Sequence, residues 1–353
     1  MVPMFSRIEG SLRAYQWGKP GGIAEMLGRE VGEPGTPEAE YWFTTDALLL
    51  KVLAAAETLS LQVHPGPGLA AEGFAREEAA GVPHDAPHRS YKDAGAKTEL
   101  ILALSDRFEA LSGFRAAEAA ARDIARLVDA AGPAAGDLAP PLMTLLAEDA
   151  TVGEAFLLVI SDEGRPLVEA LLPALDSHAA EFPVQARLAG LYPGDAGVVA
   201  SLLLNHVVLR RGEVLAARTG DIHAYLSGTG IELMVRSDNV LRGGLTPKHV
   251  DLPELRKALN VPAGEPNIVA PTALGDAALE FAVPAVPADI RLVVVRGDAQ
   301  IPLARDAIAL CIRGAFTLQA DGDEMRLERG DAARIAAAGC VAVAGEGELY
   351  VAR

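Results

Sequence analysis

The sequence predicts a mainly β protein in which two β units flank an inserted helical block. Short apolar runs separated by turn residues fill the first part of the chain and return near position 205, whereas the apolar residues between them recur at helical spacing. Residues 265–353 continue the short-strand pattern with glycine turns, which is typical of a jelly roll or a sandwich. With 353 residues, the chain is also long enough for more than one core.

The predicted elements follow in chain order. Turns containing proline and glycine separate strand-like runs in the first part, of which the clearest are 48–53 and 59–63. Helical spacing then predicts helices at 116–131, 142–146, 151–160 and 166–175, and a helix pair at 186–204 broken by a turn at 192–195. Branched apolar runs indicate strands at 207–209, 214–217 and 231–235, and later at 292–295, 307–312 and 341–344.

These changes of pattern define three expected units. A first β unit combines residues 1–112 with 205–264, and a helical domain is inserted at 113–204. A second β unit occupies 265–353. The chain therefore leaves its first sheet after about a hundred residues, forms helices, and returns to complete that sheet before the second unit begins.

A repeated turn suggests that the two β units are related. Residues 209–215 (LRRGEVL) resemble 327–333 (LERGDAA), each with a basic residue, a glycine and an acid between strands. Arg218 and His223 follow Gly212 at the spacing of the Gly-x5-Pro-x-Gly-x2-His pattern of cupin barrels, with Arg218 in place of the proline. The second copy has no such histidine, so we expect a double cupin barrel whose second jelly roll carries no metal. Ordinary hairpins also favour glycine and acidic residues, which leaves a chance similarity as the alternative.

Charge and composition exclude several classes of function. The 48 acidic residues outnumber the 31 basic ones, and a net charge of −17 repels nucleic acid and anionic membranes. The N-terminus lacks the apolar core of a signal peptide, and no apolar run reaches the roughly 18 residues of a membrane span. We therefore expect a cytoplasmic, monomeric protein whose two cysteines, Cys311 and Cys340, are reduced and buried.

Four separated residues have the chemistry of a metal site. Gln62 and His64 alternate in a predicted strand, so their side chains lie on one face. Lys97 and Glu99 repeat this alternation and end in a carboxylate, and His223 lies in the cupin-like turn. A Gln-x-His pair alone is more often structural, but one amide oxygen, two imidazoles and one carboxylate together suit a divalent ion such as zinc.

Several segments in the same order resemble the type I phosphomannose isomerases, a family of zinc-dependent enzymes. The resemblance extends over most of residues 12–260. The segments that carry it are Ala14–Gly18, Gln62–Pro65, Ser90–Asp93, Lys97–Leu100, Leu191–Asp195 and Ser237–Lys248. The last of these, SDNVLRGGLTPK, is highly specific to the family, whereas the C-terminal unit shares only general β character.

The resemblance implies a reaction and a set of site residues. It implies one zinc ion per chain, held by Gln62, His64, Glu99 and His223, and interconversion of mannose 6-phosphate and fructose 6-phosphate through an enediol. It implies Arg242 as the catalytic arginine, oriented by Asp238. Further pocket positions match Trp17, Lys51, Ser60, Lys97, Glu232 and Lys248. Proton transfer between C1 and C2 needs a base and an acid, for which we expect Glu232 and Lys97, with Arg242 stabilising negative charge.

Departures from the family keep alternatives open. Ala96 stands where many members have a histidine considered as a proton shuttle, and the pocket rim at 43–50 is shortened. A catalytically weakened cupin sensor that binds sugar phosphates is therefore one alternative, and an iron cupin oxygenase, disfavoured by Gln62, is another. Without the resemblance, Glu232 would be interpreted as a structural ion-pair partner of Arg236 or Arg242.

Overall fold

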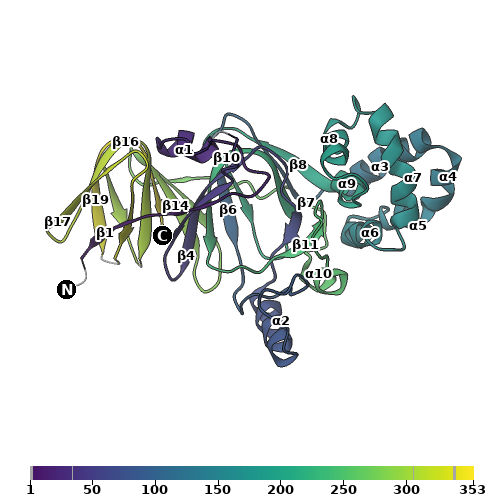
Figure 1. The fold of residues 1–353 in the computed structure, drawn as a ribbon, viewed down its shortest axis with the longest axis horizontal. Coiled ribbons are helices and arrows are strands. Elements are labelled where there is room, and N and C mark those ends of the chain that lie inside the picture. Colours follow the sequence, from purple (N-terminus) through teal and green to yellow (C-terminus); the bar gives the residue numbers. More distant parts are fainter. Residues whose placement is uncertain (1–2, 34, 305, 337–338) are drawn as a thin grey trace.

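The computed structural model describes residues 3–33, 35–304, 306–336 and 339–353. Its two antiparallel sheets and a group of helices lie in a row, with the C-terminal strands at one end and the helical group at the other (Figure 1). The mainly β class and the interrupting helices are confirmed. None of the helices in the described ranges is both long and apolar enough to cross a bilayer.

Ten strands form the sheet between these two ends, counted over the described residues. They are β2 (Ser11–Arg13), β3 (Glu40–Thr44), β4 (Leu48–Ala55), β5 (Leu61–Val63), β6 (Glu99–Ala103), β7 (Phe108–Phe114), β8 (Leu204–Leu209), β9 (Val214–Ala217), β10 (His223–Val235) and β11 (Leu241–Gly244). Strand β10 pairs with β4, β5, β6 and β7, so it is the central strand. The sequence predicted only its second half, because Gly228 and Gly230 interrupt the apolar pattern.

Nine strands form the other sheet within the described ranges. They are β1 (Phe5–Ile8), β12 (Thr272–Ala273), β13 (Ala278–Val283), β14 (Ile290–Val295), β15 (Ala299–Pro302), β16 (Ala307–Ala320), β17 (Asp323–Glu328), β18 (Ala332–Ile335) and β19 (Cys340–Ala352). The predicted division placed the N-terminus in the first unit, but β1 pairs with β18 and extends this second sheet. Cys311 is buried as expected. Cys340, the first residue of β19, is exposed, so the prediction that it is buried is wrong.

The two sheets share one apolar core. Leu50 and Val52 of β4 belong to the same buried cluster as Leu310 of β16 and Tyr350 of β19. All of these side chains are at most 2 % exposed. Burying such apolar surface contributes about 25 cal/mol for each Å² removed from water, so this core holds the two sheets together as a rigid support for the strands that carry functional residues.

The helical group is inserted between β7 and β8. Its helices are α3 (Ala117–Ala131), α4 (Pro133–Leu138), α5 (Pro140–Leu145), α6 (Val152–Val159), α7 (Arg165–Ser177), α8 (Pro183–Leu191) and α9 (Gly197–Ala200). Ile124 and Leu127 on the apolar face of α3 share a buried cluster with Val63 of β5 and Leu241 of β11. The helices therefore pack directly against the two strands that the sequence assigns to the site.

Within the helical group α4 was not predicted, and outside it three further helices were not: α1 (Gly22–Leu27), α2 (Pro67–Ala79) and α10 (Leu252–Ala258). Helix α2 has Pro67 at its first position, where the missing N–H costs nothing, but only Ala70 and Gly73 are buried, so its sequence lacks a clear apolar stripe. The side chain of Asp251 caps α10 by accepting a hydrogen bond from the backbone of Glu254. Turn residues and capping, rather than periodicity, mark these helices.

The two repeated turns have the same geometry. Gly212 and Gly330 each have a φ of 87°, in the left-handed region that favours glycine. In the first turn the backbone N–H of Glu213 donates to the carbonyl of Arg210 at 3.0 Å, and the equivalent bond from Asp331 in the second turn is 2.9 Å. The sequence similarity therefore corresponds to a shared local structure in both sheets.

Candidate metal centre and active-site pocket

The central strand β10 brings the predicted metal ligands together. His223 begins β10 and stands opposite Gln62 of β5 in the ladder, and His64 follows β5 directly. Glu99 begins β6, which pairs with β10 further along its length. The possible ligand atoms of His64, Glu99 and His223 all lie within 4.8 Å of one another, and the three residues are buried.

The hydrogen bonds that the two histidines make through Nδ1 leave both Nε2 atoms directed at Glu99. His64 Nδ1 lies 2.8 Å from the carbonyl oxygen of Asn239, and His223 Nδ1 lies 2.9 Å from that of Asp221. Because a carbonyl oxygen only accepts, each Nδ1 carries a proton, so Nε2 of the neutral ring presents a lone pair. In the metal-free site His223 Nε2 lies 3.0 Å from Glu99 Oε1. His64 Nε2 is 3.2 Å from Glu99 Oε2, yet neither atom has a hydrogen-bond partner among the described residues. Buried acceptors that face each other in this way fit a divalent cation held between them.

The charge states of these groups suit metal binding. Burial lowers the pKa of His64 to about 4, which keeps this imidazole neutral near pH 7. Burial opposes ionisation of Glu99, but Lys97 and His64 outweigh it and hold the pKa of this carboxyl well below its usual range. Lys97 Nζ lies 3.1 Å from Glu99 Oε2. Burial also opposes protonation of His223, yet the contact with Glu99 raises its pKa, so in the metal-free site a proton on His223 competes with the cation.

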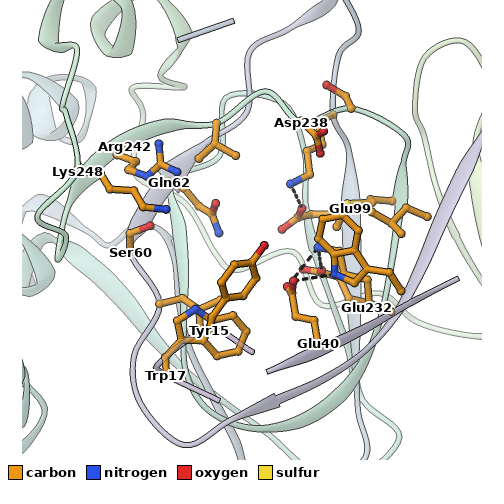
Figure 2. A pocket seen from close by; sticks show the side chains of 18 residues that line it. Tyr15, Trp17, Glu40, Ser60, Gln62, Glu99, Glu232, Asp238, Arg242 and Lys248 are labelled. Carbon is orange, nitrogen blue, oxygen red and sulfur yellow. Dashed lines mark hydrogen bonds and ion pairs between the residues drawn. The ribbon is translucent and has the colours of Figure 1, made fainter. Parts of the chain in front are cut away.

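A cavity of about 220 Å³ opens above this group. It is lined by all the predicted site residues except His64 and His223, which lie beside Glu99. The predicted residues that line it are Trp17, Lys51, Ser60, Gln62, Lys97, Glu99, Glu232, Asp238, Arg242 and Lys248. Figure 2 shows Arg242, Lys248, Gln62 and Ser60 on one side and Glu40, Glu232 and Glu99 on the other.

The carboxylate-rich side of the pocket centres on Lys51. Its Nζ is 2.7 Å from Glu232 Oε2 and 3.3 Å from Glu40 Oε1, and all three residues are buried. Burial would lower the pKa of Lys51, but the two carboxylates outweigh it and raise that pKa. Burial raises the pKa of Glu232 above its usual value, although Lys51 opposes this shift. Glu232 therefore pairs with Lys51, not with Arg236 or Arg242.

The opposite side of the pocket has two cations without a carboxylate partner. Arg242 stands opposite Gln62 in the ladder, and Lys248 follows β11. Neither forms an ion pair with a described residue, and Arg242 Nε is buried without a hydrogen bond. Burial lowers the pKa of both side chains, and the charge of Arg242 lowers that of Lys248 further. Asp238 lies across the pocket from Arg242, so the expected orienting contact is not present (Figure 2).

Asn239 explains why distant motif segments lie together. Its fully buried amide donates to the carbonyls of Asp93 at 2.7 Å and Gly95 at 2.8 Å, and it accepts from the backbone of Lys92 at 2.7 Å. Its own carbonyl is the partner of His64 Nδ1. One asparagine thus joins the 90–95 segment to the connection between β10 and β11 and orients a candidate metal ligand.

Sequence reasoning missed Glu40 and Trp42 as pocket residues. Trp42 Nε1 donates to Glu40 Oε2 at 2.8 Å, and its ring lies 5.1 Å from Lys51 Nζ. Both side chains line the cavity. The alternation of Glu40, Tyr41 and Trp42 in β3 directs the first and third to the same face, which is the pattern that could have identified them.

Comparisons with known proteins point to one family. A sequence model of the family described as "Phosphomannose isomerase type I, catalytic domain" matches residues 44–117. The chain is 37% identical to the mannose-6-phosphate isomerase of Escherichia coli K12 over 311 residues, which is 85% of this chain and 77% of that protein. It is also 31% identical over 252 residues to mannose-6-phosphate isomerase 1 of Arabidopsis thaliana, covering 67% of this chain and 55% of that protein.

Solved structures give the same result for the fold. A variant of phosphomannose isomerase from Salmonella typhimurium superposes with a TM-score of 0.85 at 29% identity, covering 99% of both chains. A zinc-bound mannose 6-phosphate isomerase superposes with a TM-score of 0.85 at 28% identity, again over 99% of both. The similarity therefore includes the second sheet and the helical group as well as the pocket.

Proposed function

This chain belongs to the type I phosphomannose isomerase family, and we propose from its pocket how it interconverts mannose 6-phosphate and fructose 6-phosphate. The observation that supports the assignment best is the buried cluster of His64, Glu99 and His223, whose possible ligand atoms all lie within 4.8 Å of one another and fit a divalent cation. Zinc is the ion of the related structures. We assign one zinc ion per chain to these three residues and Gln62. When bound, zinc acts as a Lewis acid that polarises the oxygens of the substrate carbons.

The reacting carbons belong on the carboxylate-rich side. Isomerisation moves a proton between C2 and C1, so the pocket must supply a base and an acid. Glu232 is the base, because its buried carboxylate faces the cavity and Lys51, 2.7 Å away, favours its ionised form. Lys97 supplies a proton to the developing enediol, since its ammonium lies beside Glu99 and faces the same cavity. This assignment needs no histidine at position 96.

The phosphate belongs on the side of Arg242 and Lys248. A phosphate dianion is the most strongly charged group of the substrate, and these two partly buried cations have no carboxylate partner in the described part of the chain. The hydroxyl of Ser60 lines the same side (Figure 2). Arg242 is opposite Gln62 in the ladder, so its position also supports a second role in stabilising charge near the metal group.

Removing the charge of Lys248 is expected to weaken substrate binding more than turnover. Because a hydrogen bond to a charged group contributes about 1.5–3 kcal/mol, Lys248→Met should raise KM for mannose 6-phosphate about tenfold or more. The constant kcat should change much less. Steady-state kinetics measures both. The control is Lys257→Met, which removes a lysine paired with Glu254 outside the pocket. Equal KM values in Lys248→Met and the wild type would contradict the phosphate assignment.

A coupled assay for fructose 6-phosphate tests the function directly. The purified protein is expected to turn over mannose 6-phosphate, to lose this activity with a chelator, and to regain it with zinc because the fold already brings the ligands together. Metal analysis of the purified chain should find zinc. Saturable binding of mannose 6-phosphate without turnover would instead support the sensor, and iron with oxygen consumption would support an oxygenase.

We also propose the finer organisation that surrounds this site. The shared geometry of the turns at Gly212 and Gly330 supports two cupin-like jelly rolls, of which the second carries no metal. Residues 113–204 are an inserted domain. Residues 1–112, apart from strand β1 at 5–8, form the catalytic unit together with 205–264. Residues 265–353 form the second unit, whose sheet includes β1. The net charge of −17 supports a cytoplasmic monomer without nucleic-acid or membrane partners.

A further inference from the structure

The turn at 192–197 connects α8 to α9 in the helical group and does not line the pocket. It includes the last four residues of the motif Leu191–Asp195, to which the sequence and the proposed mechanism assign no role. Its side chains nevertheless reach the two segments that carry the proposed phosphate ligands. The turn therefore links the helical group to one side of the active site.

Asp195 holds the backbone between Arg242 and Lys248. Its Oδ1 accepts hydrogen bonds from the backbone N–H of Gly197 at 2.7 Å and of Leu245 at 2.9 Å. Its Oδ2 accepts from the backbone N–H of Thr246 at 3.0 Å. A single carboxylate thus takes three backbone donors, and two of them lie in the segment that leads from β11 to Lys248.

The conformation of this segment depends on outside contacts. Leu245 has a φ of 52°, in the left-handed region that residues other than glycine rarely adopt, and its side chain is buried. The turn also approaches the segment closely, because a Cβ added to Gly197 would lie 2.7 Å from the backbone nitrogen of Leu245. An unusual backbone conformation persists only when its surroundings fix it, and Asp195 supplies two of the fixing hydrogen bonds.

The same turn also contacts the segment between β4 and β5 that carries Ser60. The hydroxyl of Tyr192 donates to the carbonyl oxygen of Thr58 at 2.6 Å. Thr58 is buried and lies two residues before Ser60. Tyr192 and Asp195 therefore hold the two chain segments between which the phosphate is expected to bind.

We propose that Tyr192 and Asp195 are positioning residues that set the spacing of Ser60, Arg242 and Lys248, so that the helical group determines phosphate affinity. This inference rests on the proposed function, in which those three residues bind the phosphate. Neither side chain touches the substrate. Their effect passes through the backbone at Thr58 and at 245–246.

The test is Asp195→Asn, which keeps the side-chain shape but replaces one acceptor oxygen with a donor. We expect KM for mannose 6-phosphate and the competitive inhibition constant of inorganic phosphate to rise together, each about tenfold, because hydrogen bonds to a charged group are lost. Tyr192→Phe removes only one hydroxyl and should raise both constants about threefold. The kcat and the zinc content should stay close to those of the wild type in both variants.

The matched control is Asp149→Asn. Asp149 also lies in the helical group and accepts a backbone hydrogen bond, from Ala117 at 2.7 Å, but it does not line the pocket. We expect it to lower the melting temperature without changing either constant. If Asp195→Asn and Tyr192→Phe likewise lower only the melting temperature, the two residues are merely structural and the inference is overturned.

Lys248→Met distinguishes failure of the proposed phosphate site from failure of the proposed positioning role. If it weakens inhibition by inorganic phosphate while Asp195→Asn and Tyr192→Phe do not, the phosphate assignment stands and only the positioning role fails. If Lys248→Met leaves inhibition by phosphate unchanged, the assignment of the phosphate side itself fails. Tyr192→Phe keeps the test decisive should Asp195→Asn not fold, because it deletes a single hydroxyl.

Discussion

Replacing His223 with alanine is expected to abolish zinc binding and to lower kcat/KM by about 10³-fold or more, since Lewis-acid stabilisation supplies several kcal/mol. His223 is fully buried, and its Nε2 lies 3.0 Å from Glu99 Oε1, so the variant removes one of the three clustered ligand side chains. The variant also leaves the carboxylate of Glu99 facing an empty volume. Zinc content by mass spectrometry and the coupled isomerase assay measure the two effects.

A second histidine gives the control for this variant. His206 on β8 is partly exposed, and its Nε2 is 3.6 Å from Glu109, away from the pocket. His206→Ala should keep zinc and activity. Undiminished activity in His223→Ala together with retained zinc would show that the buried group is not the metal centre. Loss of zinc with full activity would show that the metal is structural, which would remove the proposed Lewis acid from the reaction.

Local patterns were enough to predict that two of the four proposed metal ligands share one face, but not the half of β10 that begins with His223. The alternation of Gln62 and His64 placed both on one face, and the structure has them at the same site beside His223. Side chains two residues apart in a strand point to the same face, and this local relation does not depend on the tertiary structure. The helices between β7 and β8 were predictable for the same reason, because Ile124 and Leu127 lie at helical spacing.

Pairing between distant segments could not be predicted in this way. The N-terminal strand β1 pairs with β18, and no property of residues 5–8 alone indicates this partner. The contacts of Tyr192 with Thr58 and of Asp195 with Leu245 likewise join segments that only the complete fold brings together. The register of paired strands and the contacts between distant segments follow from which whole faces of the sheets are buried, and single sequence positions do not reveal this.

The lysines of the pocket differ in the charged groups that surround them. Of the six lysines in the chain, Lys51, Lys97 and Lys248 line the cavity. The resemblance placed them in the pocket and singled out Lys97 for proton transfer, but it did not separate the surroundings of Lys51 from those of Lys248. The structure separates them by their partners, because Lys51 and Lys97 face carboxylates whereas Lys248 lies near Arg242 and has none in the described ranges. This difference is the basis for assigning proton transfer to one side and phosphate to the other.

Replacing Glu232 with glutamine is expected to lower kcat by about 10²–10⁴-fold, the usual contribution of a general base. The amide keeps the shape of the carboxylate but cannot accept a proton from the substrate carbon. KM and zinc content should change little, because Glu232 contacts neither the proposed phosphate side nor the metal group. Steady-state kinetics and metal analysis together distinguish this result from loss of the site.

The pH dependence of the reaction gives the decisive comparison. A base works only when ionised, and burial raises the pKa of Glu232, so kcat/KM should fall at a higher pH than for an ordinary glutamate. Lys51 favours the ionised form, and Lys51→Met should therefore shift this acid limb to still higher pH. Glu280→Gln is the control, because Glu280 is a similarly buried carboxylate paired with Arg291 and Arg353 in the second sheet. If Glu280→Gln and Glu232→Gln lower kcat alike, or if the acid limb does not move in Lys51→Met, the base lies elsewhere in the pocket.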